Sequence, residues 1–226
     1  MLAVLTVVGD VVPEQLKWAG VLAGVGLLVF RMTVPEGSAW GQVALHDRTA
    51  FDAVPPAKLF GDAKQVWIFA PSGVNLLSEQ NCQLLRRTVL ARPDGVLRIV
   101  VLDPGVREGV VVAGRQLDDG LDPPLQPFAT ALEQVAGKLR NMRSWQVAGS
   151  FDFRMFPYNP GFSLVAVDPG ERNGKMIVEF HGVGNETVAA RMHIELTRDV
   201  DERWYTHWLG QFDELWKQAR ESDGAP

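Results

Sequence analysis

Two short apolar runs, each closed by a turn, constrain the fold of this chain most strongly. Residues 65–70 (QVWIFA) lead into Pro-Ser-Gly at 71–73, and residues 97–102 (LRIVVL) lead into Asp-Pro-Gly at 103–105. Such runs, rich in β-branched and aromatic residues, predict strands buried on both faces. Apolar residues recur at helical spacing between them, over residues 77–88. A strand, a helix and a second strand in this order are typical of a parallel sheet with a crossover helix.

The second half of the chain predicts a different arrangement. A helix over residues 128–142 is followed by four strand candidates, separated by turns rich in Pro, Asn and Gly: residues 150–157, 162–168, 174–181 and 190–197. Successive strands joined by short turns pair antiparallel. An aromatic helix that begins after Asp199 closes the pattern. We therefore predict an α/β domain over residues 63–222, with a mixed sheet flanked by helices.

The run 190–197 alternates along its length. We expect one set of side chains to pack on the domain (Met192, Ile194 and Leu196) and the other to face solvent (Arg191, His193, Glu195 and Thr197).

The first 34 residues form a separate apolar segment. They carry four charges, and the thirteen residues between Lys17 and Arg31 carry none. As a helix with a rise of ~1.5 Å per residue, residues 16–34 reach roughly 28 Å, close to the thickness of a bilayer core. We predict a membrane anchor in residues 1–34, as one helix or as a hairpin with the run at residues 2–8. A buried N-terminal helix of a soluble protein is the alternative.

Charge and proline content indicate how the two parts are connected and oriented. Residues 35–62 contain three prolines and no sustained period, which predicts a linker. Positive residues follow the apolar segment, which favours an inner-membrane location with the main domain in the cytoplasm. We expect the lipid bilayer to be a partner through residues 16–34.

Composition excludes several classes of function. A formal net charge of -5 gives no electrostatic reason to expect a nucleic-acid partner. The single cysteine, Cys82, excludes an intramolecular disulfide framework. The sequence contains no Walker, GxGxxG, CxxC or HExxH motif, so we expect neither a cofactor nor a metal ion.

Four segments resemble a phospholipase D-like half-domain: VWIFAPSGVNLL (66–77), LRIVVLDP (97–104), FDFRMFPYNPGFSLVAVD (151–168) and WLGQFDELWKQAR (208–220). The resemblance covers roughly residues 60–220. It implies a mixed sheet flanked by helices. Because half-domains of this superfamily commonly pair to build one site, it also implies a homodimer or a higher homo-oligomer.

The motif that defines the superfamily, HxKxxxxD, is degenerate in this chain. The matching stretch is 161–168, where Gly161 stands at the histidine position, Ser163 at the lysine position, and Asp168 is kept. In the motif the histidine attacks phosphorus and the lysine neutralises the phosphoryl oxygens. Glycine cannot attack, so the resemblance implies that this chemistry is lost.

We therefore expect a non-catalytic, membrane-anchored binding or signalling module, with a sensor or effector role in prokaryotic defence. Its ligand is expected to be a nucleotide or another phosphorylated small molecule. The candidate ligand-binding residues lie in the turn after the first strand and in the degenerate motif: Ser72, Gly73, Asn75, Gly161, Ser163 and Asp168. The turn would offer backbone N–H groups to an anion.

Two alternatives stay open. The first is a divergent phosphodiesterase or nuclease that uses His181 and Asp168 as an acid/base pair. The second is a membrane-disrupting oligomeric effector, in which the apolar segment performs the function.

Overall fold

The structure is a computed structural model, and it describes residues 14–33, 44–47, 49, 53–119 and 126–221. The chain divides into two units, residues 1–42 and residues 43–226. The first unit contains one described helix, α2 (Glu14–Thr33), which covers most of the predicted apolar helix. Among residues 18–29 of this helix, the large apolar side chains are exposed, for example Trp18 and Leu22.

The prediction of a membrane anchor has one direct structural test. Across the described residues, no helix has the length and the apolar character needed to cross a bilayer. The run at residues 2–8 lies outside the described residues. Membrane attachment therefore stays a prediction.

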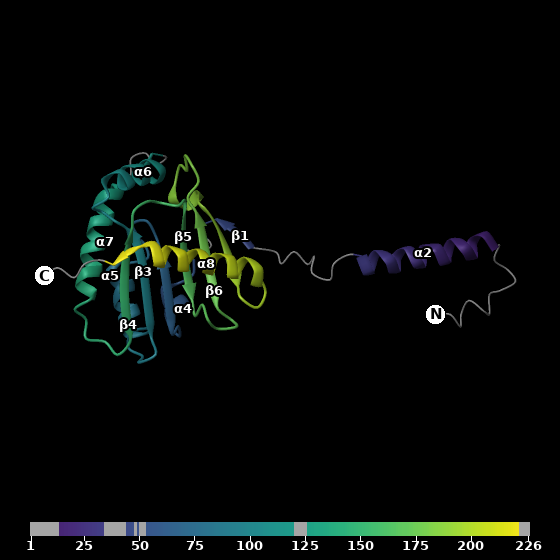
Figure 1. Cartoon of the computed structure of the whole chain (residues 1–226), viewed down its shortest axis with the longest axis horizontal. Helices are drawn as coiled ribbons and strands as arrows, with labels where there is room; N and C mark the ends of the chain where they lie inside the picture. Colours follow the sequence, from purple (N-terminus) through teal and green to yellow (C-terminus); the bar gives the residue numbers. More distant parts are fainter. Residues whose placement is uncertain (1–13, 34–43, 48, 50–52, 120–125, 222–226) are drawn as a thin grey trace. The chain divides into compact units, whose positions relative to one another are not determined.

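The second unit is built on one mixed sheet, which has eight strands among the described residues, in the order β1-β7-β6-β5-β2-β3-β4-β8 (Figure 1). β2 (Gln65–Phe69), β3 (Val96–Leu102) and β4 (Ser150–Phe156) are parallel. On the other side of β2 the strands run antiparallel: β5 (Phe162–Val167), β6 (Lys175–Phe180), β7 (Met192–Thr197) and β1 (Ala44–Asp47). The two-residue β8 (Arg220–Glu221) pairs antiparallel with β4. The predicted mixed α/β fold is confirmed.

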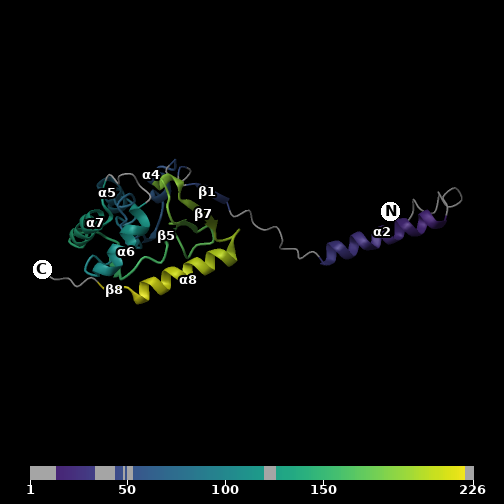
Figure 2. The same cartoon turned by 90° about the horizontal axis from the view of Figure 1, so that it is seen from above.

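Helices cover both faces of this sheet (Figure 2). One face carries α4 (Pro56–Phe60), α5 (Glu79–Arg87), α6 (Arg107–Asp118) and α7 (Phe128–Met142). The other carries α8 (Glu202–Gln218), which crosses the strands. A short 3-10 helix, Val188–Ala190, precedes β7.

An aromatic layer joins α8 to the sheet. Trp67 of β2 stacks on Phe212 at a centroid distance of 5.2 Å. Trp208 packs edge-on against Phe162 of β5 at 5.0 Å and against Phe180 of β6 at 5.9 Å. These contacts hold the start of β5 and the end of β6 on a rigid support, and the candidate site lies on the opposite face of the same two strands.

Several predicted boundaries are corrected by the structure. Residues 44–47 and 56–60 form β1 and α4, although both ranges lie in the predicted linker. The residue that caps α8 is Asp201 rather than Asp199. Instead of bonding to the helix, the Asp201 carboxylate accepts the backbone N–H of Thr197 at 3.0 Å, which closes the turn between β7 and α8.

Helix α6 was not predicted from the sequence at all. Its consecutive valines and its glycines have low helix propensity. Packing stabilises it instead, because Ala113 and Leu117 are buried. Gly109 allows a close approach, since a Cβ there would lie 2.0 Å from the carbonyl oxygen of Pro157.

Candidate functional site

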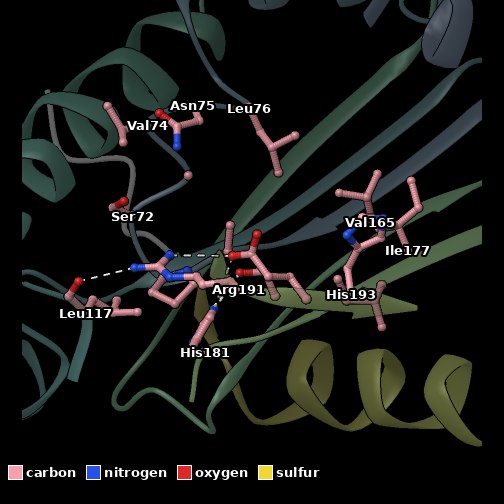
Figure 3. Close-up of a pocket in the computed structure, with 16 residues that line it drawn as sticks. Ser72, Val74, Asn75, Leu76, Leu117, Val165, Ile177, His181, Arg191 and His193 are labelled. Carbon is pink, nitrogen blue, oxygen red and sulfur yellow. Dashed lines mark hydrogen bonds and ion pairs between the residues drawn. The ribbon is translucent and has the colours of Figure 1, made fainter. Parts of the chain in front are cut away.

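A cavity of about 80 Å³ opens beside the carboxyl end of β2 (Figure 3). Its walls are the turn 70–76 after β2, the starts of β5 and β7, the end of β6, and Leu117 of α6. The chain leaves β2 toward β3 on one side and returns to β5 on the other. Ligands of α/β proteins commonly bind at such a change of direction, just beyond the carboxyl ends of the strands.

The strand register places polar side chains in one row across the sheet. Ser163 of β5 pairs with Glu179 of β6, and Glu179 pairs with His193 of β7. Directly paired residues share a face of the sheet, and so do residues two positions apart along a strand. His181 and Arg191 therefore join the same row, and all five side chains line the cavity.

His181 is fixed by hydrogen bonds to both of its ring nitrogens. Its side chain is buried, with an exposed fraction of 1%. Nε2 lies 2.8 Å from Ser163 Oγ, and Nδ1 lies 3.1 Å from Asn159 Nδ2. The backbone carbonyl of His181 also accepts a hydrogen bond from the Asn185 amide.

The neighbours of Asn159 determine which nitrogen of His181 carries the proton. The backbone N–H of Gly161 can only donate, so the Asn159 atom that it contacts at 3.1 Å is the carbonyl oxygen Oδ1. The Nδ2 group then donates to Gln116 Oε1 at 2.7 Å and faces His181 Nδ1. Because an NH₂ group cannot accept, Nδ1 is the acceptor and the ring proton lies on Nε2. Nε2–H therefore donates to Ser163 Oγ, and the hydroxyl of Ser163 directs its own proton elsewhere.

Arg191 and Glu179 form a nearly buried ion pair on the floor of the cavity. The guanidinium nitrogen of Arg191 lies 3.5 Å from Glu179 Oε1, and the two side chains are 12% and 13% exposed. A second guanidinium nitrogen donates to the carbonyl of Leu117 at 3.2 Å (Figure 3). Glu179 Oε1 also lies 4.0 Å from His181 Nε2.

The face assignment in β7 is partly corrected. Ile194 and Leu196 are buried as predicted. Met192 is 57% exposed, although it was expected to pack on the domain, and His193 is 1% exposed, although it was expected to face solvent. The turn 70–76 and Leu117 of α6 line the same cavity as His193, which encloses this histidine. Glu195, farther along the same face of β7, is exposed as predicted.

Four of the predicted ligand-binding residues line the cavity: Ser72, Gly73, Asn75 and Ser163. Gly73 has φ +67°, a left-handed conformation that favours glycine. The turn is not the N-terminus of a helix, because α5 starts only after its cap Ser78. Gly161 (φ +96°) is not part of the cavity wall, and its carbonyl accepts the backbone N–H of His181 at 3.0 Å.

Asp168 lies at the other end of β5. Ser163 pairs near the end of β6 that carries His181, whereas Val167 pairs with Lys175 at the start of β6. At ~3.3 Å per residue, Asp168 is roughly 17 Å along the strand from Ser163. Its Oδ1 accepts the backbone N–H groups of Lys64 and Gln65, each at 2.8 Å. The structure thus corrects both the expected convergence of Asp168 with Ser163 and its pairing with His181, and it indicates a structural role.

The sequence matches no family model and no curated protein. Two of the solved structures that are similar to this chain illustrate how weak the likeness is. One is TrmBL2, described as an archaeal chromatin protein with a novel mode of DNA binding: 12% identity, TM-score 0.41, covering 92% of this chain and 64% of that chain. This chain therefore spans less than two thirds of that protein.

The other is Nuc from Salmonella typhimurium, a phospholipase D family member. It shows 11% identity and a TM-score of 0.39, covering 74% of this chain and 87% of that chain. Neither comparison identifies an activity for this chain.

Three residues of the row were not among the sequence candidates: Glu179, Arg191 and His193. Their signal was the repeated spacing of a charged residue and a histidine, Glu-x-His at 179–181 and Arg-x-His at 191–193, on neighbouring strands. Among the residues that the structure describes, no group of three or more His, Cys, Asp or Glu side chains is arranged to hold a metal ion.

Proposed function

We propose that this chain is a non-catalytic binding module whose cavity holds a phosphoryl group of a small ligand. The observation that carries the proposal is the Ser163–His181 hydrogen bond in the orientation set by Asn159. Since Ser163 Oγ accepts from His181, its own O–H is directed to another acceptor. Arg191 adds a guanidinium group, which binds phosphoryl oxygens through paired N–H donors.

The size of the cavity supports a phosphoryl group rather than a whole nucleotide. Its volume of about 80 Å³ is smaller than the ~150 Å³ of an engineered cavity that binds benzene. A tetrahedral oxyanion is smaller than a benzene ring, whereas a nucleobase is larger. The rest of the ligand is therefore expected to lie outside the cavity.

A hydrolase is the second candidate, because the 2.8 Å contact between Ser163 and His181 is typical of a nucleophile and its base. The same hydrogen bonds favour binding over catalysis. A general base must present an unprotonated nitrogen to the hydroxyl. Here the nitrogen that faces Ser163 carries the proton, so His181 stabilises the oxygen of Ser163 instead of activating it.

The proposal includes attachment to the cytoplasmic face of a bacterial membrane and pairing with a second copy. Exposed apolar side chains on α2, such as Leu22 and Leu28, support membrane attachment. Pairing is implied by the resemblance to phospholipase D-like half-domains.

Calorimetric titration of the full chain with inorganic phosphate and with adenosine 5′-monophosphate tests the proposal. Ser163→Ala removes one hydrogen bond to the ligand and should weaken binding by about fivefold to tenfold. Ser144→Ala, an exposed serine at the end of α7, is the matched control and should bind as the wild type does. Hydrolysis of bis-p-nitrophenyl phosphate or DNA that is lost in His181→Ala would instead establish the hydrolase.

A further inference from the structure

Glu179 gives the cavity an unusual charge balance for a phosphoryl site. Five polar or charged side chains line it: Ser163 of β5, Glu179 of β6, His181 directly after β6, Arg191 directly before β7, and His193 of β7. Among the described lining residues, Glu179 and Arg191 carry the only formal charges, and these cancel. The guanidinium that would attract a phosphoryl group is thus already paired with a carboxylate at 3.5 Å.

This balance discriminates between the charge states of a bound group. A phosphoryl dianion has only acceptor oxygens, and it would stand beside the Glu179 carboxylate as a second, like-charged acceptor. A phosphoryl monoanion that keeps one proton presents an O–H group instead. That O–H can donate to a carboxylate oxygen of Glu179, since each such oxygen has two lone pairs, while the remaining oxygens accept from Ser163 and Arg191.

We infer that the ligand is a phosphomonoester bound as its singly protonated monoanion, with Glu179 accepting the phosphoryl O–H. The inference rests on the proposed function and narrows its ligand class. The second ionisation of a phosphomonoester has a pKa of about 6. At pH 7 most of the free ligand is therefore the dianion, and binding takes up a proton from the buffer. No covalent bond forms or breaks.

Inorganic phosphate and sulfate provide a direct test. The two anions have the same tetrahedral shape and nearly the same size, but sulfate carries no proton at neutral pH. The wild-type full chain should bind phosphate at least about tenfold more tightly than sulfate in calorimetric titrations at pH 7. Binding of phosphate should be accompanied by proton uptake, measured as a dependence of the observed heat on the ionisation enthalpy of the buffer.

Glu179→Gln is the decisive variant, because an amide keeps the shape of the side chain and removes its charge. This variant should lose the preference for phosphate over sulfate, and it should bind sulfate at least as tightly as it binds phosphate. Glu195→Gln is the matched control, since Glu195 lies on β7 outside the cavity and contacts His193 at 3.6 Å. It should keep the preference of the wild type.

Each outcome decides between the claims. Equal binding of phosphate and sulfate by the wild type, or phosphate binding without proton uptake, would overturn the inference and leave the proposed function standing. Binding of neither anion would overturn both. The proton-uptake measurement uses only the wild type, so the inference stays testable even if Glu179→Gln does not fold.

Discussion

His181 Nε2 lies 2.8 Å from Ser163 Oγ, and the orientation of Asn159 makes the histidine the donor in that contact. Ser163 lies in β5, and His181 directly follows β6, the antiparallel neighbour of β5. Asn159 precedes β5 and contacts Gln116 of α6. A serine beside a histidine is usually taken as a nucleophile. In this site the hydrogen bond between Asn159 Nδ2 and His181 Nδ1 makes the imidazole a donor to Ser163 and not its base.

The tautomer itself can be measured. Imidazole ¹⁵N chemical shifts of His181 should show a proton on Nε2 and none on Nδ1. In Asn159→Asp the new carboxylate should accept from Nδ1, which moves the ring proton there. Asn141→Asp, on the exposed side of α7, should leave the shifts of His181 unchanged. A proton on Nδ1 in the wild type would remove the argument against catalysis.

Loss of Arg191 should destabilise the fold. Arg191→Met leaves Glu179 nearly buried without its cation, which typically costs about 3–5 kcal/mol of unfolding free energy. The double variant Arg191→Met/Glu179→Gln should recover part of this loss, because no uncompensated charge remains. Urea denaturation of the two variants provides the measurement.

An exposed pair on α8 serves as the control for that experiment. Lys217 and Glu214 lie 2.8 Å apart but are largely solvent-exposed. Their contact lowers the pKa of Glu214 and raises that of Lys217, chiefly through their hydrogen bond. Surface pairs contribute little to stability. Lys217→Met should leave the urea midpoint unchanged. An equal loss of unfolding free energy in Lys217→Met and Arg191→Met would contradict the role of burial in the Arg191–Glu179 pair.

Asp168 should act on stability and not on ligand binding. Asp168→Ala removes the acceptor for two backbone N–H groups at the start of β2 and places alanine at φ +48°. We expect a loss of about 2 kcal/mol in unfolding free energy. Asp168→Asn keeps an acceptor and tolerates this backbone conformation, so it should lose less. A large change in phosphate affinity in a folded Asp168→Asn protein would contradict the structural role.

The raised pKa of Tyr205 predicts that the free energy of unfolding falls at high pH. Burial raises its pKa to about 12, with Arg198 opposing and Asp168 reinforcing the shift. In the unfolded chain the phenol ionises near pH 10. The unfolded state therefore loses this proton first, and the contribution of Tyr205 to stability is intact below pH 10 and is lost between about pH 10 and 12. Tyr205→Phe should decline less over this range than the wild type, whereas Tyr158→Phe, at an exposed position, should decline as the wild type does.

Membrane attachment is testable through α2. The full chain should co-sediment with vesicles of phosphatidylcholine and phosphatidylglycerol. Leu22→Glu/Leu28→Glu places two charges among the exposed apolar side chains of α2 and should release it. Val112→Glu, at an exposed position of α6, is the control and should leave the chain bound to the vesicles. Sedimentation that is unaffected by the α2 variant would contradict attachment through this segment.

The strands β2 to β7 and α7 were predictable, because their apolar residues form short continuous runs or follow a clear period. The short strands β1 and β8 were not predicted. Helix α6 was not, since packing overrides the low propensity of its valines and glycines. Only part of the cavity lining was predictable from the sequence. Ser72 and Asn75 were identified by their place in the turn after a predicted strand, and Ser163 by its place in the degenerate motif. The roles of Glu179 and Arg191 depend on the register between β6 and β7, which alternation along a single strand does not reveal.

The most direct test of the central claim is mapping of amide chemical shifts during a titration of the ¹⁵N-labelled full chain with inorganic phosphate. We predict saturable changes centred on the turn 72–76, on Ser163 and on Arg191, with no hydrolysis of added phosphodiester. Changes confined to other surfaces, or none at phosphate concentrations that saturate ordinary phosphate sites, would contradict a phosphoryl-binding cavity.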